Sequence, residues 1–475
     1  SFVNNGISLY FAPYKNLFNN SILNNRSTIT NCNFTVNNYF FEDQISFYSH
    51  AFLKGINGIS FSGCTFSSDL STPQNTNEYL YSRIGIYSLN SSFKVIPICN
   101  SSLFLGEVCS DEDIASNSIF TGLNYGIVAA NSDNFYQIDI KSSIFDKNDY
   151  GIYISGVNNP KILNNTFNIG KNSNNITNRP IGLYLQNSTG FRIEENVFND
   201  NSLCSLEKIG LTIKNNKEDN NIVYKNKFNH LTIGQQFLGH NYKNLSTNDE
   251  SEGLVSVCNE NELNQLSDIQ IESIESEKYP GINPFQSYLI KIDNEYVKSG
   301  ANNLFTDPED IVLQYSNEGI FINYYYNTNE PLFEPTEYYA IQPIEALYEN
   351  SCPSKISGLY PATINSELSD ISLSYGNLKY NYNQLIDAGN THALIDLIQG
   401  EWSDDVWELR TELLGQSPYL SLEALYSVAL KNLLPPALFL EICLANPDAT
   451  KSEEFLEKLR CCIPTPLLVY MIDLI

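Results

Sequence analysis

The chain has 475 residues, of which 42% are hydrophobic and 12% aromatic, so it can bury a large core and is not a disordered protein. It carries 54 acidic and 27 basic residues, a formal net charge of −27 that repels phosphate backbones and anionic lipids and excludes nucleic acid from the expected partners. Charged residues make up only 17% of the chain, and the polar remainder, rich in Asn, Ser and Thr, is typical of a secreted or surface-displayed protein.

Neither end of the chain looks like a natural terminus. The opening "SFVNNGISLYFAPYKNLF" has no basic and apolar regions of a signal peptide, and the closing "TPLLVYMIDLI" resembles an apolar helix without a cap. We therefore expect truncation at both ends, and either missing part could have carried a targeting signal. No apolar run is long enough to span a membrane.

A segment ending in phenylalanine recurs along the first half of the chain, as in "KILNNTF", "RIEENVF" and "VYKNKF". An apolar residue lies five positions before each phenylalanine, and a small or amide residue lies two positions before it. The phenylalanines are Phe34, Phe66, Phe120, Phe145, Phe167, Phe198 and Phe228. Their spacings are 32, 54, 25, 22, 31 and 30 residues. The gap of 54 predicts one additional coil whose pattern has decayed.

A second element, "YGIVAAN", "YGIYISG", "IGLYLQN" and "IGLTIKN", recurs between these anchors, and its apolar residues alternate with a period of two. That period predicts short strands. Short strands that recur at this spacing predict a right-handed parallel β-helix, in which equivalent residues of successive coils stack about 4.8 Å apart.

Stacking gives each recurrent residue type a structural role. The phenylalanines form an aromatic column in the core, and the residues two positions earlier form a turn ladder of mutually bonded side chains. The ladder residues are Cys32, Cys64, Ser118, Ser143, Asn165, Asn196 and Asn226. If their coils are neighbours, Cys32 and Cys64 come within disulfide range, although stacked free thiols are the favoured interpretation.

The coil pattern fades after about Gly239, and the next segment is rich in Pro and Tyr. We expect an irregular β and loop region over residues 251–375 that covers the end of a β-helix over residues 1–250, because an open coil end exposes unpaired backbone. Within it, "IVLQYSNEGIFINYYYNTN" predicts a hairpin around "SNEG".

From about Tyr380 the period changes to i, i+3, i+4, which predicts an all-α module of short helices over residues 376–475. Ser421 is placed to cap the third helix, Pro435 and Pro436 to begin the next, and Pro447 to end it. The only tryptophans, Trp402 and Trp407, fall in this module and are expected in its core.

Ten cysteines and no CxxC pair leave the redox state open, although an oxidising location is favoured. Cys99 and Cys109 bracket a short segment and Cys258 and Cys352 a longer one, so either pair could form a disulfide. The adjacent Cys461 and Cys462 are expected to have separate partners or none.

The sequence of the helical module resembles that of large surface proteins of Bacteroidota in which right-handed β-helix coils precede a helical segment. The segments that carry the resemblance are "LIDAGNTHALIDLI", "LRTELLGQSPYLS" and "LPPALFLEICLANP". The resemblance covers most of the chain and implies display outside the cell through the type IX secretion system, with the secretion and outer-membrane machinery as partners. It implies an adhesin-like role rather than an activity.

Acidic residues do not cluster at equivalent strand positions, which is the arrangement that hydrolysis or elimination of a polysaccharide would need. The "YGI" strands carry no carboxylate, and we expect no carboxylate pair on their face. Should the chain be an enzyme, the candidates are Asp139, Glu194, Glu195 and His230, the last with His240 as a possible neighbour. The acids are expected to lie on a solvated face. No metal site, cofactor motif or nucleophile motif is recognisable.

Three functions remain open from the sequence. The favoured one is a non-enzymatic extracellular or cell-surface protein whose β-helix is a rigid adhesin or a scaffold that binds a polysaccharide or cell-surface glycan. The alternative is a β-helix polysaccharide lyase or glycoside hydrolase, which rests on fold analogy. The third is a trimeric phage tailspike-like fibre, against which the helical module argues.

Overall fold

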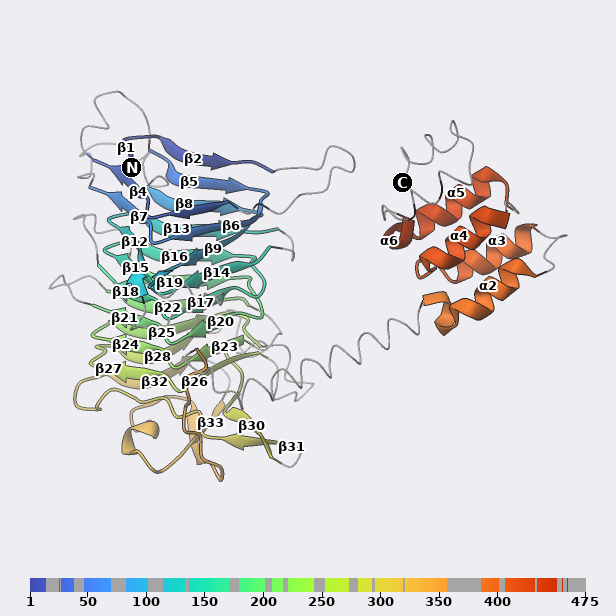
Figure 1. Ribbon diagram of the computed structural model, residues 1–475. Coiled ribbons are helices and arrows are strands. Elements are labelled where there is room, and N and C mark those ends of the chain that lie inside the picture. Colours follow the sequence, from blue (N-terminus) through green and yellow to red (C-terminus); the bar gives the residue numbers. More distant parts are fainter. Residues whose placement is uncertain are drawn as a thin grey trace. The chain divides into compact units, whose positions relative to one another are not determined.

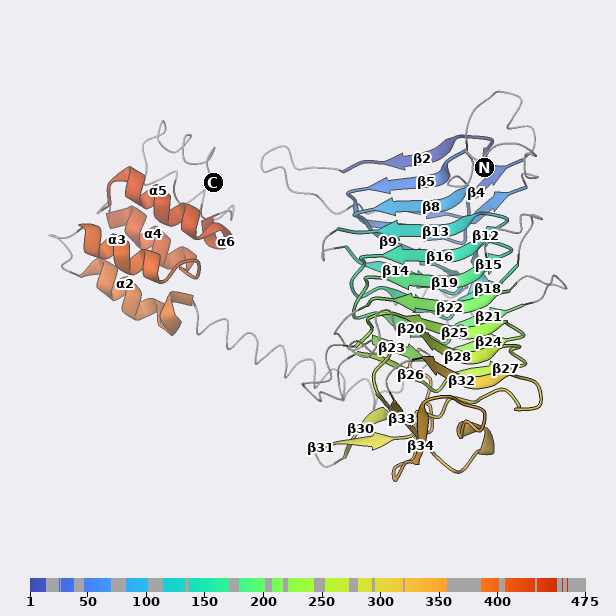
Figure 2. The same ribbon diagram turned by 180° about the vertical axis from the view of Figure 1, so that it is seen from behind.

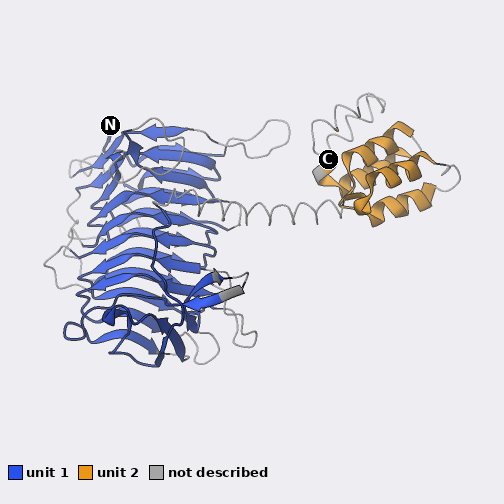
Figure 3. Ribbon diagram, turned by 60° about the horizontal axis from the view of Figure 1, so that its bottom comes forward, with its two compact units in different colours: residues 1–358 blue, residues 359–475 orange. Residues whose placement is uncertain are grey.

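The computed structural model describes residues 1–13, 25, 27–37, 47–69, 83–100, 114–132, 136–170, 179–200, 207–216, 221–242, 253–272, 281–292, 295–318, 321–356, 386–400, 406–431, 434–450, 455 and 459. The chain divides into two compact units, Ser1–Gly358 and Leu359–Ile475 (Figure 3). The expected fold class is confirmed: a parallel β-helix is followed by an irregular β and loop region and then by a helical unit.

Three long parallel sheets wrap around the core of the first unit, and each coil contributes one strand to each sheet (Figures 1 and 2). The nine-stranded sheet contains β1 (Phe2–Val3), β4 (Asn33–Val36), β7 (Thr65–Ser68), β12 (Ser118–Thr121), β15 (Ser143–Asp146), β18 (Thr166–Asn168), β21 (Val197–Asn199), β24 (Lys227–Asn229) and β27 (Glu260–Glu262).

The ten-stranded sheet contains β2 (Ile7–Phe11), β5 (Ser49–Lys54), β8 (Ile84–Leu89), β13 (Tyr125–Ala130), β16 (Tyr150–Ser155), β19 (Ile181–Gln186), β22 (Ile209–Lys214), β25 (Ile233–Leu238), β28 (Ser267–Glu272) and β32 (Leu313–Glu318). The eight-stranded sheet contains β3 (Thr28–Thr30), β6 (Asn57–Ser62), β9 (Ser92–Ile96), β14 (Ile138–Lys141), β17 (Lys161–Leu163), β20 (Arg192–Glu194), β23 (Asn221–Tyr224) and β26 (Leu254–Val257).

The recurrent phenylalanines form one continuous column inside the β-helix. Each ring lies in register with the next, and neighbouring ring centroids are 4.6 to 4.9 Å apart. Phe2 extends the column by one ring, stacking on Phe34 at 4.8 Å. Burial of these rings, all at most 1% exposed from Phe34 onward, supplies much of the hydrophobic free energy of the fold.

The residues two positions before each phenylalanine form the turn ladder. Asn165 donates from its backbone N (2.9 Å) and from Nδ2 (3.0 Å) to Oδ1 of Asn196, and Asn196 repeats both bonds to Asn226. The amides also donate to strand carbonyls, as Asn196 does to Ile162 at 2.8 Å. The ladder therefore satisfies buried polar groups at every coil, and Cys32 and Cys64 remain free thiols at its first positions.

The gap of 54 residues hides no additional coil, so that expectation is wrong. β7 pairs directly with β12, and the rings of Phe66 and Phe120 stack at 4.7 Å. The extra length emerges from the coil instead, and its described part includes the antiparallel pair β10 (Ile98–Cys99) and β11 (Ile114–Ser116). A spacing alone does not distinguish an insertion from a coil with a weak pattern.

The sheets extend past residue 250, where the repeat in the sequence fades. β27, β28 and β32 continue the stacking because the turn ladder goes on: Asn226 bonds to Asn259, and Asn259 bonds to Asn303. Phe228, however, pairs with Asn261, so the phenylalanine is missing from one coil. The parallel bridge between Glu260 and Leu304 places the buried Phe305 in the equivalent position of the next coil. The ladder ends where the backbone N of Asn303 donates to the hydroxyl of Tyr324.

The expected hairpin around "SNEG" is wrong. β32 pairs in parallel with β28, whereas β33 (Ile322–Tyr326) pairs in parallel with β29 (Phe285–Gln286) and β34 (Ile341–Glu345), so the two segments belong to different sheets. A separate antiparallel pair joins β30 (Tyr288–Ile292) and β31 (Glu295–Ser299), and η4 (Pro331–Phe333) follows β33.

After β34 the chain runs back along the coils as an extended strap, residues 346–356. Asn350 bonds to Asn302 and Asn327, Cys352 forms a disulfide with Cys258, and Ser354 reaches Glu195. The Cys258–Cys352 pair is therefore one that the sequence had suggested. Cys99 is also disulfide-bonded, while Cys109, Cys461 and Cys462 lie outside the described residues.

The described residues of the second unit form η5 (Ile386–Gly389), α2 (Thr391–Gln399), α3 (Val406–Gly415), α4 (Leu422–Lys431), α5 (Pro436–Ala445) and α6 (Pro447–Thr450) around an apolar core. The hydroxyl of Ser421 accepts from the backbone N of Ala424 and caps α4, as expected, and Pro436 begins α5. None of the helices in the described ranges is long and apolar enough to cross a membrane.

Trp407 is not a core residue, contrary to the expectation. Its side chain is 64% exposed, because α3 buries Leu409 and Leu413, one turn apart, and Trp407 lies two positions before the first of them, on another face of the helix. Trp402 lies outside the described residues.

Candidate functional site

The outward side chains of the ten-stranded sheet form a strip along the coils, which we call the outer strip. Parallel pairing places one residue per coil in the same column. In strand order this column consists of Tyr10, Phe52, Tyr87, Val128, Tyr153, Tyr184, Thr212, Gln236, Gln270 and Ser316.

The first half of the outer strip is aromatic. Tyr10 stacks on Phe52 with ring centroids 5.3 Å apart, and Phe52 contacts Tyr87 at 5.2 Å. Tyr153 and Tyr184 stack at 5.2 Å with their planes 5° apart. Beside this column, Tyr125 stacks on Tyr150 at 4.9 Å. Solvent reaches these rings, and Tyr10 is 57% exposed, so the aromatic rings lie at the surface rather than in the core.

The second half of the outer strip is built of amide and hydroxyl groups. Thr212 donates to Gln236 at 3.3 Å, and Gln236 donates to Gln270 at 3.3 Å. Within the aromatic half, Nε2 of Gln186 on β19 donates to the hydroxyl of Tyr153 on β16 at 2.6 Å. The strip thus changes along its length from ring surfaces to hydrogen-bonding side chains.

The central strands of the aromatic half carry no formal charge, and the exposed Lys54 at the end of β5 is a cation that borders them. β8, β13, β16 and β19 contain no acidic or basic residue. Burial raises the pKa of Tyr153 and Tyr184, and burial together with the neighbouring Tyr87 raises the pKa of Tyr48 to about 12. The phenols are therefore neutral throughout the physiological pH range, and this surface differs from the acidic average of the chain.

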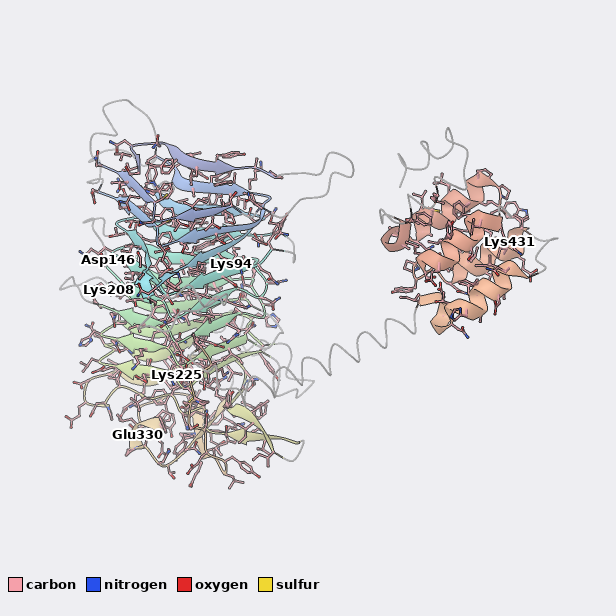
Figure 4. The ribbon with its side chains drawn as sticks, viewed as in Figure 1. Lys94, Asp146, Lys208, Lys225, Glu330 and Lys431 are labelled. Atoms are coloured by element: carbon pink, nitrogen blue, oxygen red, sulfur yellow. A yellow bond between two sulfur atoms is a disulfide. The ribbon has the colours of Figure 1, made fainter. Side chains whose placement is uncertain are left out.

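Asp139 lies on the outer side of the eight-stranded sheet, on β14. Its register partners are Lys94 on β9 and Lys161 on β17, and its carboxylate is 3.9 Å from Nζ of Lys141. Asp139 is 8% exposed and flanked by lysines, so charge pairing within the sheet accounts for a carboxylate at this nearly buried position. Lys94, on this side of the β-helix, is labelled in Figure 4.

Glu194 and Glu195 are adjacent in sequence, but each is held by a different group. Glu194 is 2% exposed and accepts two bonds from Arg192, from Nε at 3.0 Å and from Nη2 at 2.6 Å. Glu195 lies in the turn at φ 54°, where its Oε1 accepts from the hydroxyl of Ser354 at 2.6 Å and the backbone N of Lys355 at 3.0 Å.

The structure does not bring these carboxylates together into a pair. Asp139 and Glu194 are separated by two coils and two residues along the strand, which corresponds to about 12 Å between Cα atoms from strand spacings. In a glycosidase, two carboxylates converge on the substrate. Here the carboxylates are far apart, and the two glutamates are bound by Arg192 and by the strap.

His230 and His240 lie at opposite ends of β25, so they do not approach each other. His230 is exposed in one turn, and His240 donates its backbone N to Asn215 in another. Among the residues that the structure describes, no group of three or more His, Cys, Asp or Glu side chains could hold a metal ion.

Our sequence reasoning missed the outer strip, because it searched the "YGI" strands for carboxylates alone. The signal was present in the fourth position of these segments, occupied by tyrosine in "YGIYISG" and "IGLYLQN". Comparing that position between coils would have found Tyr153 and Tyr184, but not Tyr10 or Phe52, which belong to strands without the motif.

The fold and this surface define the chain as a parallel β-helix protein with an aromatic outer strip. No family model, no curated protein and no solved structure matches the chain. Its function is therefore argued from its own residues.

Proposed function

We propose that the protein is a non-enzymatic extracellular or cell-surface protein whose β-helix acts as a rigid adhesin or carbohydrate-binding scaffold. The observation that carries this proposal is the aromatic half of the outer strip, whose central strands β8, β13, β16 and β19 carry no charged residue. Exposed rings on a solvent-facing surface are well suited to contact the apolar faces of sugars, and neighbouring amides and hydroxyls to contact sugar hydroxyl groups.

The β-helix is suited to hold such a surface in a fixed geometry. Apart from Tyr10 on the terminal strand β2, each outward ring lies on a strand that is hydrogen-bonded to two neighbours in a coil that also contains the phenylalanine column and the turn ladder. Ligand binding then requires little ordering of the protein, which favours affinity for a repetitive polymer.

We further propose that the chain acts outside the cell, as a surface protein of the Bacteroidota kind exported by the type IX system. The Cys258–Cys352 disulfide favours an oxidising location. The net charge of −27 and the scarcity of basic residues agree with a secreted protein that does not bind nucleic acid.

The alternative, a polysaccharide lyase or glycoside hydrolase, has only the fold class in its favour. Its candidates Asp139, Glu194 and Glu195 are engaged in contacts with lysines, Arg192 and the strap, and His230 lies apart from them. We therefore keep catalysis as an outcome of the experiment rather than as a second proposal.

The test measures binding and product release on the same polysaccharide panel. We expect the full chain to bind at least one polysaccharide without releasing reducing ends or unsaturated products. The double variant Tyr153→Ala/Tyr184→Ala should lose at least tenfold in affinity. Tyr339→Ala is a matched control, because Tyr339 is 64% exposed and lies outside the ten-stranded sheet.

Product release would overturn the non-enzymatic proposal and make Asp139, Glu194, Glu195 and His230 the next residues to substitute. An equal loss of binding in Tyr153→Ala/Tyr184→Ala and in Tyr339→Ala would show that the outer strip is not the binding surface. No binding to any polysaccharide would remove the carbohydrate part of the proposal.

A further inference from the structure

The aromatic column of the outer strip is interrupted at one coil. Tyr87 on β8 and Tyr153 on β16 are both in register with Val128 on β13, the strand between them. Valine has no ring, so the contacting rings of Tyr10, Phe52 and Tyr87, the last tilted by 50° against Phe52, are separated from the stack of Tyr153 and Tyr184.

The interruption leaves room for one ring. Neighbouring coils are about 4.8 Å apart, so the positions of Tyr87 and Tyr153 in the column are separated by about 9.6 Å, twice the stacking distance. Val128 is only partly buried and forms the floor of this space. A ring inserted above Val128 would lie about one stacking distance from the aromatic residue on each side.

The walls of this space are tyrosines with defined contacts. The ring of Tyr125, on the same strand as Val128, contacts Tyr153 edge-on at 6.1 Å, so it borders the space rather than continuing the stack. The hydroxyl of Tyr153 accepts a hydrogen bond from Gln186 and keeps its own proton for donation to a ligand. Gln186 also reaches Ser155 at 3.3 Å, which adds polar groups at the rim.

The charges around the space select the ligand class. The outward positions of β8, β13, β16 and β19 are Tyr, Leu, Val, Ala, Ser and Gln, without a formal charge. A uronic acid or sulfated sugar would lose hydration there with no cation on these four strands to compensate it, since the outward Lys54 on β5 lies two coils away from the strand of Val128. The net charge of −27 also disfavours polyanions. A neutral pyranose offers an apolar ring face and hydroxyl edges, which match the rings and the rim.

We propose that the space above Val128, between Tyr87 and Tyr153, is a subsite for one neutral pyranose ring of a polysaccharide. The inference rests on the proposed glycan-binding function and deepens it by naming the subsite and the sugar class. The repeat of the coils also favours a polymer that runs along the outer strip, because further sugars then meet Tyr184 on one side and Phe52 on the other.

The test is to fill the proposed subsite with a larger side chain at position 128. In Val128→Tyr the substituted ring completes the column between Tyr87 and Tyr153, so we expect binding of neutral polysaccharides (β-glucan, mannan, xylan and galactan as probes) to fall at least tenfold. Tyrosine is favoured on an exposed strand position, so the midpoint of thermal unfolding should not fall. Val128→Ala keeps the space open and should bind within about threefold of the unchanged protein.

Ser316→Tyr is the matched control, since Ser316 lies in the same column at β32, away from the interruption. The subsite is supported if Val128→Tyr loses binding to neutral polysaccharides while Val128→Ala and Ser316→Tyr retain it. Equal binding by Val128→Tyr and the unchanged protein, or binding of alginate and pectate instead of neutral glycans, overturns the subsite while the proposed function stands. Absence of binding to every polysaccharide overturns both.

Discussion

Gly151 and Phe167 share one space in the core: a Cβ atom on Gly151 would lie 2.8 Å from Cδ1 of the Phe167 ring and 2.5 Å from the carbonyl oxygen of Gly182. The same relationship recurs at Gly126 with Phe145, and at Gly182 with Phe198. The glycine of each "YGI" or "IGL" segment therefore packs against the column phenylalanine that follows it in the sequence, and neither residue can change size alone.

Gly151→Ala is expected to destabilise the first unit by roughly 1–3 kcal/mol, towards the upper end, because backbone as well as a ring must move. Gly415→Ala is the matched control, because a Cβ there meets nothing within 4 Å and the substitution should change stability little. Urea unfolding followed by far-UV circular dichroism measures both.

Tryptophan fluorescence gives an internal reference for that experiment, since Trp402 and Trp407 both belong to the second unit. We expect the fluorescence transition to be unchanged in Gly151→Ala. Adding Phe167→Leu should recover only part of the loss, because it relieves the ring contact but not the contact with Gly182. An unaltered unfolding midpoint in Gly151→Ala would contradict the close packing of the glycine and phenylalanine columns.

The second prediction concerns the turn ladder. Asn196→Ala removes the acceptor of two bonds from Asn165 and the donor to Ile162, in a site with no solvent exposure. Leaving such groups unpaired costs about 1–3 kcal/mol each, so we expect a loss of about 2–5 kcal/mol. Asn199→Ala, at a partly exposed position that accepts one bond from Asn229, should cost less than about 1 kcal/mol. Similar losses in the two variants would mean that the ladder adds nothing beyond ordinary surface contacts.

The phenylalanine column and the turn ladder show how much of the fold the sequence alone predicts. The period-two strands, the phenylalanine column and the asparagine turns are local and repeated, so one residue type per coil identifies them. The prediction of where the β-helix ends failed because the residue type at equivalent positions changes from one coil to the next. At Asn261 the phenylalanine is replaced, and at Asp268 the glycine is replaced in the neighbouring column, so the coils continue while the pattern is interrupted until Phe305.

Long-range contacts between unlike segments were the least predictable from the sequence. Glu195 could be identified as an acidic residue next to a strand, but its partners Ser354 and Lys355 follow it by 159 and 160 residues and belong to no repeat. The outer strip lies between these extremes. Its tyrosines occupy the fourth position of three strands with this motif, β8, β16 and β19, and its Val128 interruption becomes visible only when the strands are aligned in register.

The third prediction concerns the strap. Disulfide Cys258–Cys352 closes a loop over a sequence separation of 94, and Lys225, labelled in Figure 4, donates from Nζ to the carbonyl of Cys352 at 2.9 Å. We expect Cys258→Ser/Cys352→Ser to lower the stability of the first unit by about 2–4 kcal/mol through the entropy of the unfolded chain. Urea unfolding by circular dichroism measures the loss.

The reducing agent dithiothreitol gives the matched comparison. It should destabilise the unchanged protein, and the effect should be smaller in Cys258→Ser/Cys352→Ser by the amount that this disulfide contributes, which separates it from the disulfide at Cys99. Equal effects of the reductant on the two proteins would show that the strap is held by its hydrogen bonds to Asn302, Asn327 and Glu195 alone.

The fourth prediction concerns two buried ionisable groups at opposite ends of the β-helix. Burial lowers the pKa of His50 to about 4, although its Nε2 bonds to the carbonyl of Ser67 at 2.9 Å. Burial raises the pKa of Asp268 to about 6, against the opposing effect of bonds from Asn264 and Thr306. Both residues are fully buried, so each pKa shift contributes to the free energy of unfolding.

The two contributions have opposite signs. The unfolded chain binds a proton at His50 below pH 6.5 while the folded chain does not, so stability falls as the pH drops from 6.5 to about 4. At Asp268 the unfolded chain loses its proton above pH 3.8 while the folded chain retains it up to about 6, so stability falls as the pH rises through that range. Each contribution amounts to about 3 kcal/mol, from about 1.4 kcal/mol per pKa unit.

Between pH 4 and 6 the two slopes largely cancel in the unchanged protein, and single substitutions should reveal each one. We expect Asp268→Asn, relative to the unchanged protein, to lose stability more steeply on acidification, since only the His50 contribution remains. His50→Gln should show the reverse slope, becoming less stable as the pH rises from 4 to 6. Urea unfolding at half-unit pH intervals measures both, and parallel pH profiles for the three proteins would contradict the assignment of these two groups as the opposing pair.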